Sequence, residues 1–483
     1  MANFVSIPAA GPLALTVTSL CVALAAGAAN GEHAEAARPN VVVFLADDLG
    51  YGDLGCFGHP HIATPNLDRL ADQGARLTSF YASAPVCSPT RASLLTGRAP
   101  PRHGLVNVIE TTDADMRLAA DEVLLAESLS RSGYVTGIVG KWHIGEAPPF
   151  RPTRRGFDFF FGGLLGSLDF FRHDFVGGQH DLWRGDFHES RDGQYITDLE
   201  ADQAVAFIAE HADEPFFLYV PWHAVHTSLG STTKGQLQAP KAWLARYANI
   251  ADERARTYAA CVSALDEGVG RVLDSLEAAG AAENTLVIFT SDNGPEPNWT
   301  GTAAPYHSTK HTLWEGGIRV PCVARWPVHI APGVVIDTPA VTHDLFPTIL
   351  AATGAPRDER VTLDGENLLP VLLDVSGPEA DRLAERTLCW SYIRDTLRVS
   401  REQAARRGRW KWLNGELYDL KTDPGETRDL SADKPEVAAE LAAAWRAWVD
   451  QFPNEAARWR GRQPLRHKSD QRRASPSAAA EVK

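Results

Sequence analysis

The sequence lacks an excess of basic residues, and this argues against one broad class of function. Its 483 residues include 47 Lys and Arg against 61 Asp and Glu, which gives a formal net charge of −14. A protein that binds nucleic acid needs a basic surface for the phosphate backbone, so we expect no nucleic-acid partner. Any anion site in this acidic chain must be a local concentration of Arg, Lys and His.

Long apolar runs are missing after the first 30 residues, so we expect no stable membrane span in the rest of the chain. The run GPLALTVTSLCVALAAGAA, followed by Ala-x-Ala options, predicts a secretory signal peptide over residues 1–30. No Lys or Arg precedes this run, and a membrane anchor is the alternative. A signal peptide predicts an exported protein, either periplasmic or secreted.

The cysteines lack the spacing of a disulfide framework or a zinc site. Five remain after the predicted signal peptide, namely Cys56, Cys87, Cys261, Cys322 and Cys389. An odd number of cysteines in an exported protein leaves at least one thiol to explain. The surroundings of Cys87 make it the candidate for a functional role.

Cys87 lies in the stretch APVCSPTRASLLTGR, which follows an aromatic, strand-like run. We predict a short helix here, with Ser88 as the N-cap and Pro89 at the first helical position. Arg91 follows Cys87 by about one turn and shares its face of the helix. Because helix N-termini attract anions, the motif predicts a thiol beside an anion site.

Apolar runs alternate with helical patterns between residues 38 and 377, which predicts an α/β sandwich with a large, mainly parallel sheet. Four runs are typical of strands buried on both faces: NVVVFLADD, YVTGIVGKWH, PFFLYVPWH and NTLVIFTSDNG. Residues 378–460 contain shorter strand patterns and a closing helix, and we predict a small C-terminal subdomain with an antiparallel sheet. Residues 461–483 are basic and aperiodic, which predicts a disordered tail.

Polar clusters end all four predicted strands, and parallel strands place their carboxyl ends at one edge of a sheet. The residues in these clusters are Asp47, Asp48, Lys141, His143, His223, His226, Asp292 and Asn293. A single such pair is usually a turn, but four clusters at equivalent ends predict a ligand site.

The chemistry of these clusters divides into two sets. Asp47, Asp48, Asp292 and Asn293 supply only oxygen donors, which suits calcium, with magnesium as the alternative. The cationic or proton-carrying set comprises Lys141, His143, His226 and Arg91. Together the two sets predict a metal beside a cationic pocket for a tetrahedral oxyanion ester. A purely structural metal beside surface basic residues is the alternative.

Several motifs in this order resemble those of the type I, formylglycine-dependent sulfatase family. CSPTRASLLTGR is similar to its first signature, GYVTGIVGKWHIG to its second, and LADDLGYGDLGCFG and SDNG to its metal-binding strand ends. ELYDLKTDPGETRDL resembles the family's C-terminal subdomain. Within that family, the resemblance is to arylsulfatases and N-acetylgalactosamine-6-sulfatases. The resemblance implies an alkaline-phosphatase-like fold and sulfuric ester hydrolysis.

In this family a maturation enzyme oxidises the motif cysteine to Cα-formylglycine (3-oxoalanine). The resemblance therefore implies that Cys87 acts as a hydrated aldehyde, a geminal diol, and not as a thiol. One hydroxyl attacks sulfur and forms a sulfated enzyme. The second hydroxyl then loses its proton and expels sulfate.

The resemblance also implies roles for individual residues. Asp47, Asp48, Asp292, Asn293 and modified Cys87 match the metal ligands, and the family metal is usually calcium. Arg91 matches the residue that orients the formylglycine, Lys141 and Lys310 match contacts to sulfate, and His143 matches the base that releases sulfate. His226 matches the proton donor to the leaving alcohol, with His223 second for that role, and Ser167 matches a serine near the formylglycine.

The substrate we expect is a sulfated carbohydrate, attacked at a chain end, with small arylsulfates as surrogates. We predict that the stretch from Gly166 to His188 is the specificity loop, because its Phe, Trp, His and Arg side chains, Trp183 and Arg172 among them, suit stacking on sugar faces and contacts to anionic groups. A loop that only packs on the domain is the alternative. The alternative enzyme is a phosphomonoesterase or phosphonate monoester hydrolase of the same superfold. A carbohydrate-binding protein without catalysis is the alternative outside enzymes.

Overall fold

The computed structural model describes residues 1–3, 38–109, 117–297, 300–394 and 400–459. Apart from residues 1–3, the predicted signal peptide lies outside this set, as does the predicted tail over 461–483. The chain divides into two units, Met1–Ala37 and Arg38–Lys483, and the elements below belong to the second. Within the described ranges, no helix combines the length and apolarity needed to cross a membrane.

A ten-stranded sheet forms the centre of this unit, in the order β11-β2-β10-β9-β1-β8-β4-β5-β6-β7. The five strands β9, β1, β8, β4 and β5 run parallel to one another. In chain order the strands of this sheet are β1 (Asn40–Ala46), β2 (Ala75–Leu77), β4 (Val135–Val139), β5 (Phe159–Gly162), β6 (Trp183–Arg184), β7 (Phe187–His188), β8 (Phe216–Pro221), β9 (Thr285–Ser291), β10 (Cys322–Arg325) and β11 (Val334–Ile336). The predicted mainly parallel sheet is confirmed.

The sheet is covered on both faces, and strand β1 shows how its sequence serves both. Val41, Val43 and Leu45 pack into the core on one face, while Val42, Phe44 and Ala46 pack into the core on the other. A strand with two buried faces needs apolar residues on both, as this one has from Val41 to Ala46. One face carries α1 (Pro65–Asp72), α5 (Ile196–His211), α6 (Lys241–Arg246) and α7 (Glu253–Ala278). The other carries α2 (Cys87–Thr96), α4 (Leu125–Arg131), α9 (Leu345–Thr353), α10 (Leu369–Leu373) and α11 (Pro378–Ala384).

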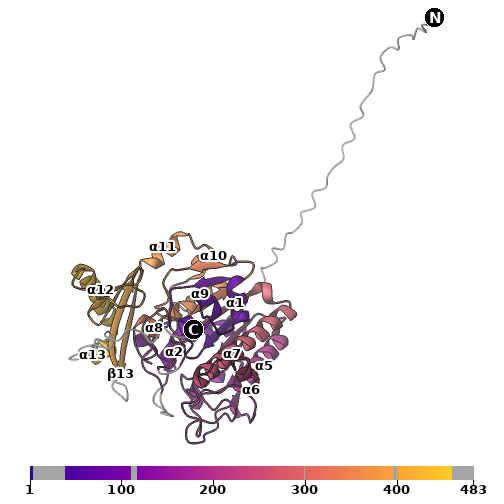
Figure 1. Ribbon diagram of the computed structural model, residues 1–483, viewed down its shortest axis with the longest axis horizontal. Coiled ribbons are helices and arrows are strands. Elements are labelled where there is room, and N and C mark those ends of the chain that lie inside the picture. Colours follow the sequence, from indigo (N-terminus) through magenta and orange to yellow (C-terminus); the bar gives the residue numbers. More distant parts are fainter. Residues whose placement is uncertain (4–37, 110–116, 298–299, 395–399, 460–483) are drawn as a thin grey trace. The chain divides into compact units, whose positions relative to one another are not determined.

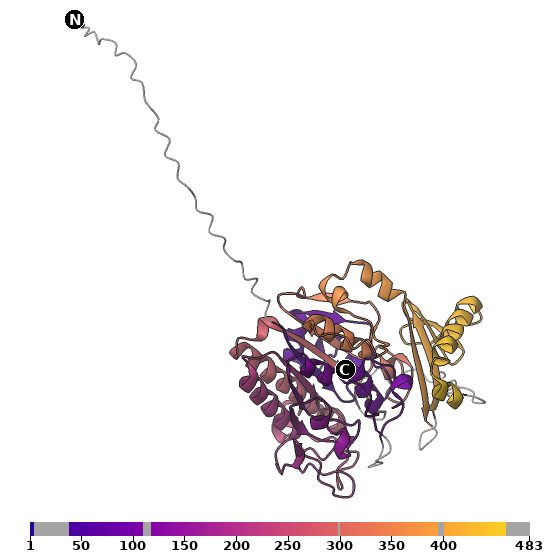
Figure 2. The same ribbon diagram turned by 180° about the vertical axis from the view of Figure 1, so that it is seen from behind.

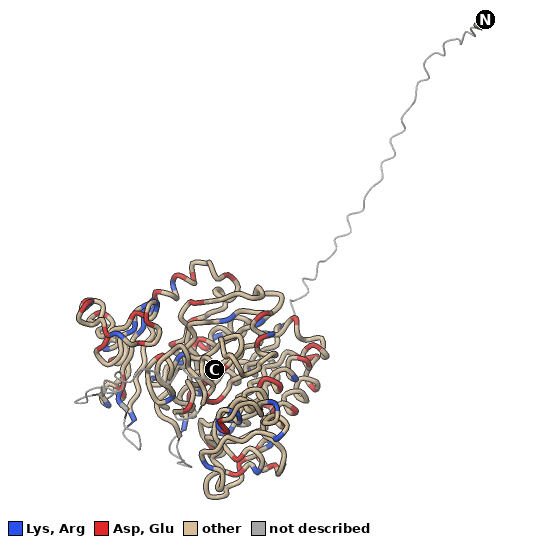
Figure 3. The backbone as a smooth tube through the Cα atoms, in the orientation of Figure 1, with Lys and Arg blue, Asp and Glu red and all other residues tan. Residues whose placement is uncertain are grey.

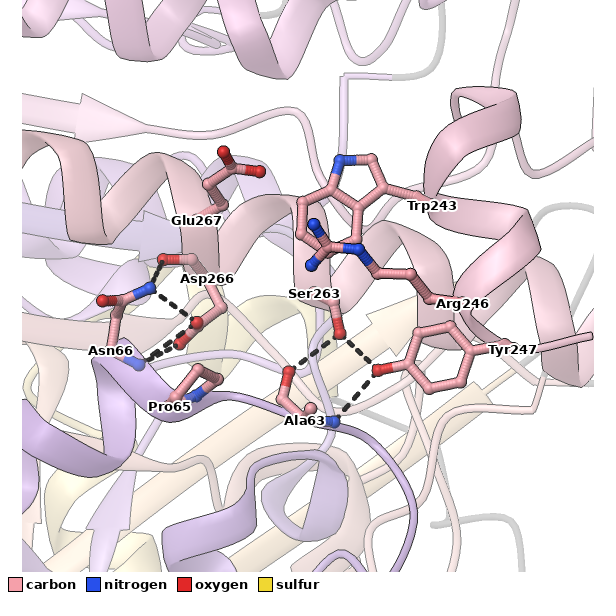
Figure 4. Close-up of a pocket in the computed structure, with 9 residues that line it drawn as sticks. All are labelled: Ala63, Pro65, Asn66, Trp243, Arg246, Tyr247, Ser263, Asp266 and Glu267. Carbon is pink, nitrogen blue, oxygen red and sulfur yellow. Dashed lines mark hydrogen bonds between the residues drawn. The ribbon is translucent and has the colours of Figure 1, made fainter.

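The first face has its own polar anchor between helices α1 and α7. Asp266 of α7 accepts hydrogen bonds from the backbone N–H groups of Asn66 and Leu67, which are unpaired donors at the start of α1. The Ser263 hydroxyl donates to the carbonyl of Ala63 just before that helix. These residues border a cavity of about 360 Å³ (Figure 4). The contacts fix α1 against α7.

A second sheet lies beside the α/β body (Figures 1 and 2). Its antiparallel strands, in order, are β13 (Thr387–Arg394), β14 (Ser400–Arg407), β15 (Trp410–Leu413) and β16 (Glu416–Asp419). Helix α12 (Pro435–Val449) packs Trp445 and Leu441 on one face, next to α13 (Pro453–Trp459). The other face packs Trp390 and Tyr418 against Tyr81 of the α/β body.

The start of this second part differs in detail from the sequence pattern. Helix α11 packs Ala380 and Leu383 into the α/β core, and the antiparallel sheet begins only at Thr387. Smaller elements complete the described fold: β3 (Phe80–Tyr81), β12 (Ala340–Val341), α3 (Pro100–His103) and α8 (Glu315–Ile318). The large sheet with flanking helices and the small antiparallel sheet confirm the predicted fold class, and the domain boundary at residue 378 stays a prediction.

Candidate active site

The four polar clusters lie at the ends of four adjacent parallel strands. Strand β1 lies between β9 and β8, and β8 is also paired with β4. Their carboxyl ends therefore meet at one edge of the sheet. All the predicted residues there are buried or nearly so, including three acids and two lysine or arginine side chains that are at most 2% exposed: Asp47, Asp48, Asp292, Lys141 and Arg91.

Cys87 is the first residue of α2, whereas the predicted helix began at Pro89. Val86 has the extended conformation of an N-cap, so the prediction that Ser88 caps the helix is wrong by two positions. The Ser88 hydroxyl instead accepts the backbone N–H of Ile109, and the Thr90 hydroxyl donates to the carbonyl of Val86. Cys87 thus lies in the first helical turn, where backbone N–H groups are unpaired. Its side chain is only 1% exposed.

Arg91 connects the Cys87 helix to two strand ends. Its guanidinium donates to Asp292 Oδ2 through Nε (3.0 Å) and Nη2 (2.8 Å), and to the carbonyl of Lys141 (3.0 Å). A forked donor of this kind fixes both orientation and charge. Arg91 therefore holds α2 against the ends of β9 and β4.

The two lysines pair with different aspartates of the two that follow β1. Lys141 Nζ donates to Asp47 Oδ2 at 2.6 Å, and Lys310 Nζ donates to Asp48 Oδ2 at 2.8 Å. Lys310 also lies 3.4 Å from His226 Nε2. The structure thus brings Lys310 to the strand-end residues, although it lies far from them in the sequence.

The two histidines present ring nitrogens that can accept protons. His143 Nε2 donates to the carbonyl of Ile109, which leaves Nδ1 as the acceptor facing Cys87 Sγ at 3.4 Å. His226 Nδ1 donates to the carbonyl of Thr227, so Nε2 accepts from Lys310. Burial lowers the pKa of His226 to about 4 and, with Lys141, holds the pKa of His143 well below its usual value. Both rings are therefore neutral near pH 7.

The oxygen donors fit a divalent cation. Asp47 Oδ1 and Asn293 Oδ1 are buried oxygens without a hydrogen-bond partner among the described residues. Ligand atoms of Asp47, Asp48 and His226 also lie within 4.8 Å of one another. The carboxylates of Asp47, Asp48 and Asp292 balance the charges of Arg91, Lys141 and Lys310, so a divalent cation would give the pocket the positive charge that an anionic ester needs.

Metal binding is expected to be pH-dependent because of Asp292. Burial and the nearby Asp47 raise the pKa of Asp292 to about 6. Below pH 6 a proton competes with the cation, so the apparent Kd for calcium should fall about fivefold as pH rises from 5 to 6, about twofold more by pH 7, and level off above that. Titration calorimetry in two buffers measures the affinity and the proton released. A calcium affinity that is the same at pH 5 and pH 7 would contradict this assignment.

The loop after β5 lies against the histidines. A Cβ on Gly166 would be 2.9 Å from His143 Nε2, and one on Gly163 would be 2.7 Å from His223 Nε2. The Ser167 hydroxyl donates to the carbonyl of Thr227, beside His226. Ser167 is fully buried, so the structure places it in the wall of the site.

The prediction that Trp183 stacks on a sugar is wrong. Its side chain is 7% exposed, its indole N–H donates to Asp181, and Arg151 covers its ring at 4.3 Å. Asp181 also accepts the backbone N–H groups of Leu164 and Leu165. Trp183 thus supports the loop beside the site, because its indole N–H is hydrogen-bonded to Asp181 and its ring is covered by Arg151. Arg172 keeps a side-chain exposure of 46%.

His223 does not face the oxygen donors in the way His226 does. Its Nδ1 lies 2.5 Å from Glu200 Oε1, and both side chains are fully buried. Glu200 was not among the residues predicted from the sequence. The pattern that could have indicated it is an acidic residue at helical spacing between Ile196 and Ala204, on the buried face of α5. This pair forms a buried layer behind the residues that line the site.

Comparison with known proteins identifies the family. A family model described as Sulfatase matches residues 39–355, more than half of the chain. The chain belongs to the sulfatase family. This sulfatase is 38% identical to human arylsulfatase A over 388 residues, which is 74% of the chain and 71% of the relative. It is 36% identical to human N-acetylgalactosamine-6-sulfatase over 403 residues, with 78% and 72% covered.

Solved structures agree with this assignment. A crystal structure titled Ps i-CgsB in complex with k-i-k-neocarrahexaose superposes with a TM-score of 0.79 at 30% identity, covering 88% of this chain and 97% of that one. A phosphonate monoester hydrolase of Agrobacterium radiobacter superposes with a TM-score of 0.59 at 22% identity, covering 87% and 96%. At that identity the likeness shows only the fold.

The family match and the named relatives show that the protein is a sulfuric ester hydrolase, as predicted from the sequence.

Proposed function

We propose that this sulfatase removes sulfate from sulfated carbohydrates, with Cys87 converted to formylglycine. The observation that carries the proposal is a buried, hydrogen-bonded network beside Cys87. His143 contacts the Cys87 sulfur, and the network joins the cations and His226 to four oxygen donors: Arg91, Lys141, Lys310, Asp47, Asp48, Asp292 and Asn293. Positive groups fixed in a buried site stabilise a tetrahedral anion more than water can. A hydrated aldehyde at position 87 would supply the oxygen nucleophile.

The other residues have distinct tasks in this proposal. Lys141 and Lys310 lie on either side of the Asp47–Asp48 pair and bind sulfate oxygens. His143 accepts a proton at Nδ1, the nitrogen that faces residue 87. His226 and Lys310 share a hydrogen bond and together deliver a proton to the leaving oxygen once the ester's negative charge lies beside them.

A divalent cation fits between the strand ends, and Asp47, Asp48, Asp292 and Asn293 would hold it together with the modified side chain at position 87. We propose calcium, with magnesium as the alternative, because these donors are hard oxygens. When bound, it would lower the pKa of an attached hydroxyl group and neutralise sulfate charge. Arg91 keeps the Asp292 carboxylate in place for this purpose.

The substrate class is supported by the relatives and by the charge distribution. One relative is named for N-acetylgalactosamine 6-sulfate, and a solved neighbour is titled with a carrageenan-type hexaose. In the view of Figure 3, Lys and Arg are interspersed with Asp and Glu along the backbone. The sequence motifs that form the site contain no long run of basic residues that would hold an anionic chain. We therefore propose action at a chain end. The N-terminal apolar run supports export, and a formylglycine-generating enzyme is the maturation partner.

A panel of sulfated oligosaccharides tests this proposal through the release of free sulfate. We expect release from oligosaccharides whose terminal residue carries the sulfate, and about tenfold or more slower release when only internal residues carry it. A small arylsulfate should be cleaved as a surrogate, and the matched arylphosphate far more slowly. Faster turnover of the phosphate would favour the phosphomonoesterase or phosphonate hydrolase alternative, and equal release from internal positions would contradict action at a chain end.

A further inference from the structure

The segment from Lys310 to Glu315 carries one of the sulfate-binding lysines, yet the C-terminal sheet holds its far end. The backbone N–H of Leu313 donates to Glu402 of β14, and that of Glu315 donates to Glu426, which follows β16, at 2.7 Å. Both glutamate side chains are at most 1% exposed. Buried carboxylates that accept backbone N–H groups define the path of a segment that has no regular structure until α8 begins at Glu315.

Lys411 of β15 fixes these carboxylates from the C-terminal side. Its Nζ lies 2.9 Å from Glu315 Oε1 and 2.9 Å from Glu426 Oε1, and all three side chains are at most 1% exposed. Without this ammonium group, two buried carboxylates would lie side by side and repel each other. A buried ion pair of this kind adds little net stability compared with apolar packing, so its value lies in the arrangement it specifies.

The other end of the segment is fixed to the active site. Lys310 donates its backbone N–H to Pro295, and His311 donates to Pro85, two residues before Cys87. A Cβ on Gly294, which follows the oxygen donor Asn293, would lie 1.9 Å from the Gly316 carbonyl oxygen. The segment from Lys310 to Glu315 is the covalent connection between the two sets of contacts, and Gly316 just after it packs tightly against Gly294.

We propose that Lys411 is a positioning residue for Lys310 and acts through Glu426 and Glu315. The C-terminal sheet thereby sets where the Lys310 ammonium meets the sulfate group, although the two are connected only through the segment from Lys310 to Glu315. This inference rests on the proposed function, since it assigns Lys310 to the sulfate group.

A double-mutant cycle tests this role. Lys411→Met in the otherwise unchanged enzyme should lower kcat/KM for an arylsulfate by about 10- to 100-fold, because small misplacements of a binding group have effects of that size. In a Lys310→Ala enzyme the same change should lower kcat/KM less than about twofold, since the group being positioned is gone. Equal losses in both backgrounds would show that Lys411 has only a structural role and would overturn the proposal.

Matched variants keep the test independent of folding. Glu426→Gln retains an oxygen for the Glu315 N–H but weakens the Lys411 pair, and it should show the same dependence on Lys310 with a smaller loss. Arg409→Met breaks an exposed ion pair with Asp419 in the same sheet and should leave kcat/KM unchanged. If Lys411→Met does not fold, the Glu426→Gln cycle decides.

Calorimetric binding of inorganic sulfate repeats the cycle without turnover. We expect Lys411→Met to weaken sulfate binding about tenfold when Lys310 is present and not when it is absent. An unsubstituted enzyme that carries formylglycine at position 87 and cleaves no sulfate ester would contradict the proposed function itself. An active enzyme with additive losses would contradict only the positioning role.

Discussion

Replacing Cys87 with alanine is expected to abolish sulfate release, with a loss of at least about 10⁴-fold in kcat. Cys87 is the one cysteine placed against His143 Nδ1, at 3.4 Å. Burial raises the pKa of its thiol, so an unmodified cysteine there would be a poor thiolate nucleophile. In the proposed mechanism the residue matters because it is converted to an aldehyde, which alanine cannot become.

Serine at position 87 should be nearly as inactive in a host whose maturation enzyme acts on cysteine, since an alcohol cannot form a geminal diol. Cys56→Ala is the matched control, because Cys56 is a half-buried free thiol outside the site, and its rate should be unchanged. Steady-state release of sulfate from an arylsulfate measures all three variants. A Cys87→Ala enzyme that retained a tenth of the rate would contradict the assignment of the nucleophile.

Replacing Asp292 with alanine is expected to remove the bound metal and the activity together, with a loss of about 10³-fold or more. Asp292 accepts two hydrogen bonds from Arg91, and its Oδ1 accepts the backbone N–H of Asp48. Its removal takes away an oxygen ligand and leaves a buried guanidinium without its partner. Elemental analysis of purified protein should show about one calcium per chain in the unsubstituted enzyme and much less in the variant.

Two further variants separate these effects. Asp292→Asn keeps the shape and one oxygen, so it should bind calcium weakly and regain part of its rate when calcium is in excess. Asp274→Asn is the matched control outside the site, because Asp274 is an exposed aspartate of α7 that pairs with Arg69, and its rate should be unchanged. Full activity of the unsubstituted enzyme after removal of its metal would show that the ligand assignment is wrong.

The strand ends were predictable from the sequence because buried parallel strands have a simple pattern. After Asn40, the strand NVVVFLA is apolar at every position, and the polar residues follow directly at its carboxyl end. The order of strands along the sheet was not predictable, because it depends on packing between segments far apart in the chain. That order is what brings Asp47, which follows β1, within reach of Lys141, which follows β4.

Contacts between distant segments explain what the sequence analysis missed. Glu200 pairs with His223 across 23 residues, and Lys411 reaches Glu315 across 96 residues, with no local pattern that marks either pair. Trp183 failed as a sugar platform for a related reason, since composition cannot show that Arg151 and Asp181 already occupy its ring and its N–H. The position of α2 was misjudged locally, because a helix can begin at Cys87 itself when Val86 is extended.

Peptide mass spectrometry of residue 87 tests the central claim most directly. Trypsin releases the peptide LTSFYASAPVCSPTR, which ends at Arg91, from protein made together with a formylglycine-generating enzyme. We expect active preparations to contain this peptide with the –CH₂–SH group of Cys87 replaced by –CHO, in proportion to their rate of sulfate release. Active protein in which Cys87 is found only as unmodified cysteine would contradict the central claim.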